Sequence, residues 1–301
     1  MADTPYDVLV AAVWRGEDVR ADDRTLRHAF ALAARNQVEG AFANVFRDRL
    51  REELAGAQSA DRAFRRNLEE ACTLLRRRGI EPILIKAPPQ DLYTYGNFDL
   101  VVGEENWTEA IESLRTWARR FSTHPLERTK LLAWPESGPA AHLHQSVSWF
   151  DVPVIDAEAL RVGAIEDSRV PALLPSDVDE LRILLAHAMF QNLALDLAEL
   201  LRFRRLLGTQ VSVADATRRA EAEGWCRAFE RAFRFAADTV GALDAGRLIR
   251  LPAPVPVFDA VAAGFEHAVN LVRRGNTFSG AREALLRLVL VTAKRRRMIF
   301  G

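Results

Sequence analysis

The spacing of apolar residues changes abruptly at Gly79, and this change limits the possible fold more than any other feature of the chain. Before Gly79, apolar residues recur every three or four positions, as amphipathic helices require. After it, short apolar runs alternate with prolines and glycines, which is typical of buried strands. The expected strands cover residues 82–86, 98–102, 129–134 and 141–149. The helical spacing returns after Pro175, so the order predicts an α+β fold with a small mixed sheet between two helical regions.

Three blocks follow from this order. They are a helical N-terminal region, a mixed α/β core and a helical C-terminal region, at residues 1–78, 79–172 and 173–301. Ser59 and Asp61 are the expected start of a helix that Gly79 ends, because glycine readily adopts the left-handed conformation after a last helical turn. A further helix is expected over residues 104–120 of the core. Residues 251–256 contain three prolines and are expected to connect two helices.

Composition narrows the classes of protein to consider. Lys plus Arg and Asp plus Glu both number 41, so the chain lacks the basic surplus of a general nucleic-acid binder. Its two cysteines, Cys72 and Cys226, support neither a disulfide framework nor a Cys-x-x-Cys metal site. Asp3 and Asp7 stand where a signal peptide carries basic residues, and the apolar stretch 285–293 is too short to span a bilayer. We therefore expect a cytoplasmic protein that binds neither nucleic acid nor membrane.

Four stretches carry a recognisable pattern in a fixed order. They are GI followed by ILIKA within 79–87, FDLVV at 98–102, AHLHQ at 141–145, and LAHA with DLAELL within 185–201. This ordered set resembles the motifs of a poorly characterised bacterial family with the nucleotidyltransferase fold. The resemblance implies a nucleotidyltransferase-like core sheet flanked by N-terminal and C-terminal helices.

The resemblance also implies a position for the chemistry. In the nucleotidyltransferase superfamily, two carboxylates one residue apart on a strand and a third on a neighbouring strand hold two magnesium ions. The corresponding positions here are Asn97, Asp99 and His142, so a single carboxylate remains. Magnesium favours charged oxygen ligands, and we expect weak or absent binding of magnesium-ATP unless Asp91 or Asp151 supplies a ligand.

His142 and His144 lie two residues apart, on one face of an expected strand. With Asp99 they form two histidines and one carboxylate, a set that transition metals use. The alternative is that they are polar pocket residues or hydrogen-bonded structural residues, and we predict no metal. In that case His142 is the expected catalytic acid or base, because histidine titrates near neutral pH, and Asp99 is its orienting partner.

Other residues near these positions are candidates for binding. Lys86 ends the first expected strand, where it could hold an anionic or carbonyl oxygen or remain a solvated strand end. Tyr93 and Tyr95 could wall a pocket or pack in the core. The complete set of binding candidates is Lys86, Tyr93, Tyr95, Asn97 and His144. His187 and Asp196 are interpreted as helical residues of the interior that close the back of the cleft.

Three functions remain open. The first is a metal-independent enzyme that uses the old nucleotide cleft for a small-molecule substrate, with secondary-metabolite biosynthesis as a suggested setting. The second is a magnesium-dependent nucleotidyltransferase that acts on a small molecule and takes a nucleoside triphosphate. The third is a non-catalytic ligand-binding or regulatory protein. An open, charged cleft with Asp99 and His142 would favour an enzyme, whereas a cleft filled by aromatic side chains would favour the third function. The substrate, the cofactor and the oligomeric state stay unknown.

Overall fold

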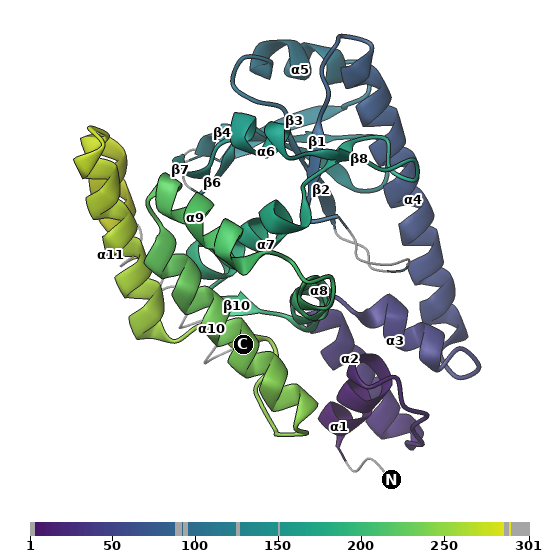
Figure 1. Ribbon diagram of the computed structural model, residues 1–301. Helices are drawn as coiled ribbons and strands as arrows, with labels where there is room; N and C mark the ends of the chain where they lie inside the picture. Colours follow the sequence, from purple (N-terminus) through teal and green to yellow (C-terminus); the bar gives the residue numbers. More distant parts are fainter. Residues whose placement is uncertain are drawn as a thin grey trace.

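The sheet at the centre of the computed structural model is mixed, as the sequence predicts. The structure describes residues 4–87, 92, 96–124, 127–149, 151–285 and 289. The strands are β1 Ile83–Ile85, β2 Asn97–Val101, β3 Arg120–His124, β4 Glu127–Trp134, β5 Ala140–His144, β8 Ile165–Glu166 and β9 Leu173–Leu174. They form a seven-stranded sheet in the order β3-β4-β5-β2-β1-β9-β8 (Figure 1). β2 runs parallel to β5 and β1 to β9, while the other neighbours are antiparallel.

One face of the sheet packs against two helices, α4 (Arg51–Arg76) and α5 (Trp107–Leu114). Leu84, Phe98 and Leu143 point to this face and share a core with α4 and α5. Successive side chains of a strand point to opposite faces. Asn97, Asp99 and His142 therefore point to the other face.

That other face packs against helices from both ends of the chain (Figure 1). The N-terminal elements are α1 Pro5–Leu9, the π-helix η1 Val10–Trp14, α2 Asp23–Arg35 and α3 Glu39–Val45. α6 Ala157–Val162 belongs to the middle of the chain. The C-terminal ones are α7 Asp177–Ala186, the π-helix η2 His187–Asn192, α8 Leu197–Gly208, α9 Val213–Glu223, α10 Cys226–Asp244 and α11 Val257–Arg273. Residues 277–285 are also helical. Two small sheets join β6 (Val147–Trp149) to β7 (Val152–Ile155) and β10 (Ala194–Leu195) to β11 (Ala253–Pro254).

The N-terminal helices share one hydrophobic core with the C-terminal helices and with β1. The Trp14 indole donates a hydrogen bond of 2.9 Å to Asp244, between η1 and α10. The buried Asn36, directly after α2, accepts one of 3.2 Å from the backbone N–H of Leu197, at the start of α8. The hydrophobic core therefore includes residues from all three of the blocks that the sequence suggests.

Two expected boundaries in the first half of the chain need correction. α4 is one helix from Arg51, so Ser59 and Asp61 lie inside it and do not start it. The helical spacing of apolar residues continues through both positions and outweighs their tendency to cap helices. Gly79 does follow the helix in a left-handed conformation, with φ of +74°. The helix expected over 104–120 covers only Trp107–Leu114, because residues 115–119 turn the chain toward β3, which begins at Arg120.

The strand expected over 141–149 is also wrong in part. The chain turns at 145–146, so that β5 ends at His144 and pairs with β2 and β4, whereas β6 begins at Val147 and pairs with β7. Ala141 and Leu143 before the turn and Val147 and Trp149 after it keep the same alternation, and for this reason the sequence pattern does not reveal the turn.

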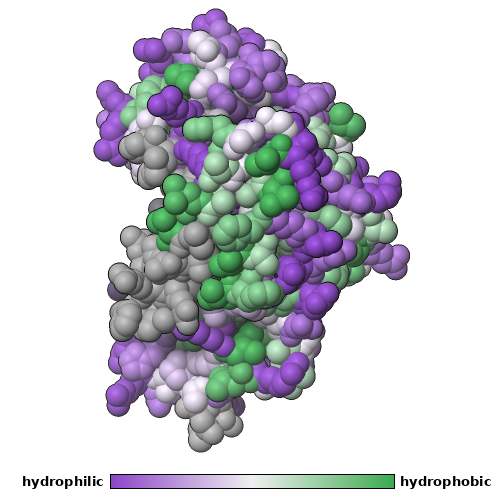
Figure 2. Space-filling model, turned by 90° about the vertical axis from the view of Figure 1, so that its left-hand side faces the viewer, coloured by the Kyte–Doolittle hydropathy of each residue, from purple (hydrophilic) through white to green (hydrophobic). Residues whose placement is uncertain are grey.

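α11 has one face toward α10 and another toward solvent. Figure 2 views the molecule from the side of α11 and shows apolar side chains gathered along the middle of this surface. Among the exposed apolar residues of α11 are Phe258, Phe265, Val269 and Val272. Within the described ranges, no helix combines the length and the apolar composition that crossing a bilayer requires.

Candidate functional site

Asp99 lies where three elements of the sheet bring polar side chains together. β2 and β5 are neighbours, as expected; they run parallel, and Asp99 pairs directly with His142 in their register. On its other side, Asp99 pairs with Ile85 of β1, which places Lys86 at the next position of the chain. His144 is two residues beyond His142 and points to the same face. The strand pairing thus gathers Lys86, Asp99, His142 and His144.

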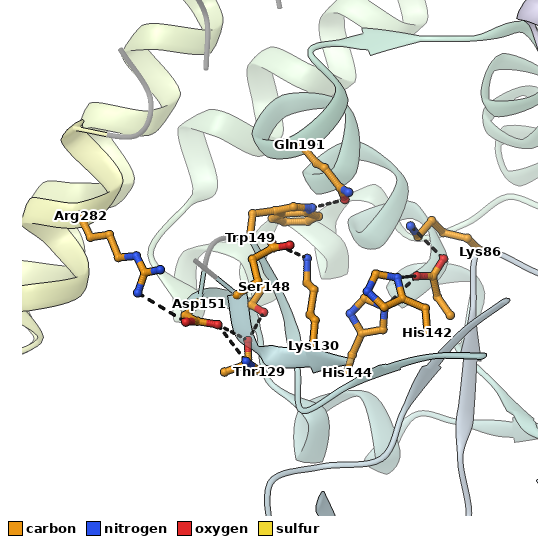
Figure 3. A network of polar contacts seen from close by, with 12 residues as sticks. Lys86, Thr129, Lys130, His142, His144, Ser148, Trp149, Asp151, Gln191 and Arg282 are labelled. Carbon is orange, nitrogen blue, oxygen red and sulfur yellow. Dashed lines mark hydrogen bonds and ion pairs between the residues drawn. The ribbon is translucent and has the colours of Figure 1, made fainter. Parts of the chain in front are cut away.

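Asp99 accepts hydrogen bonds from all three neighbours (Figure 3). Its Oδ1 lies 2.9 Å from Nδ1 of His142 and 2.7 Å from Nε2 of His144. Its Oδ2 lies 3.0 Å from Nζ of Lys86. Burial by itself raises the pKa of Asp99, but the Lys86 cation and the hydrogen bonds from the two histidines outweigh burial and hold that pKa well below its ordinary value. Asp99 is therefore an ionised acceptor at neutral pH.

The two histidines differ in their access to solvent. The side chain of His142 is 20% exposed, whereas that of His144 is 5% exposed. Burial and the neighbouring His142 lower the pKa of His144 well below 6.5, so its ring stays neutral. The ring centroids are 4.2 Å apart, which makes His144 a support for His142. Behind His144, the buried Lys130 forms an ion pair of 3.1 Å with Glu127.

A cavity of about 320 Å³ opens in front of His142 and Asp99. Both the sheet and the helices packed against it contribute side chains. The lining residues are Gln37, Lys86, Asn97, Asp99, Leu132, His142, Leu184, His187, Gln191, Asn192, Glu199 and Arg202. Asn97 and Lys86 thus lie at the cavity as the sequence suggests, and His144 lies behind it. Tyr93 and Tyr95 are outside the described residues.

The π-helix η2 forms one wall of the cavity. It contributes His187, Gln191 and Asn192, and it ends at Leu193 in a left-handed conformation. Short π-helical segments occur frequently at functional sites. The Trp149 indole donates a hydrogen bond to the Gln191 side chain, as Figure 3 shows, and Trp149 stacks on Phe190. The wall is therefore fixed from behind by an aromatic pair.

His187 forms a second histidine–carboxylate pair at this wall. Its Nδ1 lies 2.9 Å from Oε1 of Glu199, and Oε2 of Glu199 accepts 3.0 Å from the backbone N–H of Asp196. Asp196 in turn accepts 2.8 Å from the backbone N–H of Glu199, which completes a capping box at the start of α8. His187 lies at the cavity, as the expected back of the cleft, but it is more than an interior helical residue, because a fixed carboxylate orients it.

Asp196 is an N-cap and does not line the cavity. Burial and the nearby Glu199 raise its pKa well above the ordinary value.

Two lining residues have a strained backbone. Gln37 has φ of 57° and Lys86 has φ of 56°, in the left-handed region that side chains other than glycine rarely adopt. Such strain collects at functional sites, where the surrounding structure holds it in place. The sequence gives no signal for this backbone strain.

The capping box of Asp196 and Glu199 did have a sequence signal, an acidic residue three positions before Glu199. This signal could have drawn attention to Glu199.

The site has a limited set of metal ligands. Asp99, His142 and His144 each present one ligand atom, and these atoms lie within 4.8 Å of one another, a set that suits a transition metal better than magnesium. Lys86 already balances the charge of Asp99. Asp151 is held elsewhere, by Thr129 at 2.9 Å and Arg282 at 3.4 Å (Figure 3), and Asp91 lies outside the described residues.

Comparison with protein-family models, with curated proteins and with solved structures returns no match for this chain. The nucleotidyltransferase resemblance therefore rests on the sequence motifs alone.

Proposed function

We propose that this protein is an enzyme that transfers protons on a small polar substrate in the cavity, without a metal ion. The observation that carries the proposal is the contact of 2.9 Å between Nδ1 of His142 and the ionised Asp99, at the wall of a cavity. A carboxylate that accepts from Nδ1–H selects the neutral tautomer with its basic nitrogen at Nε2. A base that is oriented by a carboxylate is a common arrangement in general acid–base catalysis.

The neighbours of Asp99 support this role. A buried carboxylate would otherwise take up a proton, and it would then be a weaker acceptor for Nδ1–H of His142. Lys86 at 3.0 Å and His144 at 2.7 Å keep Asp99 ionised. We therefore assign Lys86 and His144 to positioning, and His142 is the residue next to Asp99 that transfers the proton.

The second pair suggests what kind of reaction the cavity supports. His142 stands on the sheet and His187 on the helical wall, and each imidazole has its own carboxylate. One imidazole can accept a proton from a substrate C–H or O–H while the other returns a proton to a different substrate atom. The substrate then gains and loses one proton, as in an isomerisation, or releases its hydroxyl group as water, as in a dehydration. A role in secondary-metabolite biosynthesis would fit such chemistry.

The two other functions have less support. A magnesium-dependent nucleotidyltransferase needs carboxylates for its metal ions, and Asn97 and His142 replace two of them. The charge of Asp99 is already balanced by Lys86. A purely binding protein would be favoured by an apolar, filled cleft, whereas Leu132 and Leu184 are the apolar residues among the described lining.

The test is incubation of the protein with a polar extract in the presence of EDTA, followed by chromatography, which separates isomers of equal mass, and mass spectrometry of the depleted metabolites. Wild-type protein should consume a substrate, and His142→Ala should slow this turnover about 10²–10⁴-fold, the usual contribution of a positioned acid or base. His142→Gln should be equally slow, since an amide can hydrogen-bond but cannot transfer the proton. His28→Ala, at an exposed histidine of α2, is the matched control and should retain full activity.

Full turnover by His142→Ala would contradict the assignment of His142. Turnover that EDTA abolishes, and that magnesium with a nucleoside triphosphate restores, would favour the nucleotidyltransferase instead.

A further inference from the structure

We propose that the cavity selects a neutral small molecule with several hydroxyl groups, of the size of a monosaccharide or a cyclitol. That such a molecule is the substrate rests on the proposed function. That it binds is argued independently, from the charges, the amide groups and one buried acceptor of the cavity.

The lysine and the arginine among the described lining residues are already paired. Nζ of Lys86 lies 3.0 Å from Asp99, and Nε of Arg202 lies 3.2 Å from Glu180. Arg202 also donates to the backbone carbonyl of Ala87. A di- or triphosphate requires several cations or bound metal ions for its charge. Among the described lining residues the two cations, Lys86 and Arg202, are both engaged, so a multiply charged anion would have to break an existing ion pair.

Side-chain amides dominate the remaining polar groups. They come from the N-terminal region, from β2 and from η2, and they are Gln37, Asn97, Gln191 and Asn192. Each amide offers both a donor and an acceptor, as each hydroxyl group of a sugar does. A ring of amides with balanced charge therefore matches a neutral hydroxylated molecule.

Gln37 gives the strongest single indication. Its Oε1 atom is buried and has no hydrogen-bond partner within the described part of the chain. A buried acceptor without a donor costs free energy, so a donor is expected from outside the protein. The buried Asn36 holds this position in place, because it donates 2.9 Å to the Leu32 carbonyl and accepts 3.2 Å from Leu197. Gln37 lines the cavity with a strained φ of 57°, and a hydroxyl or amide proton of a ligand would satisfy its oxygen.

The size of the cavity agrees with this class. Its volume of about 320 Å³ lies at the lower end of the range for small-molecule sites. A larger hollow of about 1160 Å³ lies between α4 and residues 166–172. Two arginines that line it are engaged in ion pairs with acidic residues that line it as well. Arg65 contacts Asp61 at 2.9 Å, and Arg169 contacts Asp167 at 2.6 Å. The described residues that line that hollow include neither histidines nor side-chain amides, which mark the smaller cavity.

The test is ligand binding by the full-length protein, measured as a thermal shift and then by calorimetry. The probes are a panel of neutral monosaccharides and cyclitols at millimolar concentration, compared with magnesium-ATP and with inorganic pyrophosphate. A ligand that binds the folded state raises the melting temperature, and we expect this from a member of the neutral panel. Gln37→Leu should weaken that binding about tenfold to a hundredfold, because the hydrogen bond to the ligand is lost.

Gln210→Leu is the matched control. Gln210 also has φ of 57°, and its side chain is exposed, so the substitution repeats the backbone strain without touching the cavity. Without ligand, Gln37→Leu should melt no lower than Gln210→Leu, since Oε1 of Gln37 loses no partner.

Three outcomes would overturn the inference: a neutral panel without effect, a shift by magnesium-ATP or pyrophosphate alone, or a ligand-free Gln37→Leu that melts well below its control. A neutral ligand that binds but is not consumed would count against the proposed enzyme and leave the inference intact. Turnover of a multiply charged anion would keep the enzyme and reject the inference.

Discussion

Asp99 positions the side chains around it because it is both buried and ionised. It accepts from His142, His144 and Lys86, and these contacts hold its pKa well below the ordinary value in spite of burial. Each histidine that donates to Asp99 is fixed in one tautomer. The two rings then diverge in role, because His142 meets the cavity while His144 is enclosed.

The buried neutral His144 predicts a particular pH dependence of stability. The unfolded chain protonates this histidine as pH falls below about 6.5, whereas burial and the nearby His142 keep the folded pKa well below that value. The unfolded state then binds more protons than the folded state. The free energy of unfolding therefore decreases as pH is lowered from 6.5 to 5, by up to about 1.4 kcal/mol per pH unit. His144→Gln, whose amide can still donate to Asp99, should remove that part of the slope.

Urea unfolding at several pH values measures this slope, with the exposed His28→Gln as the control. The raised pKa of Asp196 gives the opposite trend, since its folded form keeps a proton that the unfolded form loses. The difference between wild type and His144→Gln isolates the histidine. Identical slopes in the two proteins would show that His144 is not held neutral.

The sequence predicted the residues of the sheet better than those of the helical wall. Strand periodicity placed Asn97 and Asp99 on one face, because every second residue faces the same way, and the resemblance to the nucleotidyltransferase motifs implied His142 beside them on a neighbouring strand. Gln37, His187 and Glu199 reach the cavity through the packing of helices against the sheet. Helical spacing shows which side of a helix is apolar, but it does not show which element will cover it.

At the scale of elements, η2 shows how a local irregularity builds a wall. The sequence predicted helical structure through 185–201, and the structure has α7, then the π-helix, then a new start at Leu197. Hydrogen bonds from i to i+5 widen the helix and change which residues share a face. His187, Gln191 and Asn192 all line the cavity from this segment. No residue type marks a π-helix clearly, so its position could not be predicted from the sequence.

Gly40 in α3 allows the backbone of Leu92 to approach the helix closely. A Cβ atom at Gly40 would lie 2.2 Å from the backbone oxygen of Leu92, which is far inside contact distance. Gly40→Ala should therefore lower the free energy of unfolding by about 1–3 kcal/mol, the usual cost of overpacking. Gly56, in α4, has open space at the same point, and Gly56→Ala should raise stability by about 0.5–1 kcal/mol.

Urea unfolding measures the free energy of unfolding of both variants and shows whether it decreases for Gly40→Ala and increases for Gly56→Ala. An alanine at Gly40 that stabilises as much as the one at Gly56 would show that α3 and Leu92 are not in close contact.

At the scale of the whole molecule, the cavity lies where the three expected blocks meet. Gln37 comes from the first block, His142 from the second and His187 from the third. The linear order of helical and strand segments was predictable, because each has a local pattern. The meeting of the first and last blocks was not, because contacts across long sequence separations leave no local pattern. The candidate site consequently depends on the complete chain.

This dependence predicts cooperative unfolding. Asn36 links α2 to α8, since its side chain accepts from the backbone N–H of Leu197 while its backbone carbonyl accepts 3.3 Å from Ala198. Asn36→Ala leaves the buried Leu197 N–H without its acceptor and should lower the free energy of unfolding by about 1–3 kcal/mol. Asn44→Ala, at an exposed position of α3, is the matched control and should change stability by less than about 0.5 kcal/mol.

Hydrogen exchange in increasing urea follows α2 and α8 separately in each variant. The shared core predicts that both helices lose protection at the same urea concentration in wild type, and that both shift together in Asn36→Ala. Loss of protection in α2 well before α8 would mean that the N-terminal helices form a separate unit. In that case Gln37 could not be held at the cavity by the core that α2 and α8 share, and its role in ligand selection would have to come from other contacts.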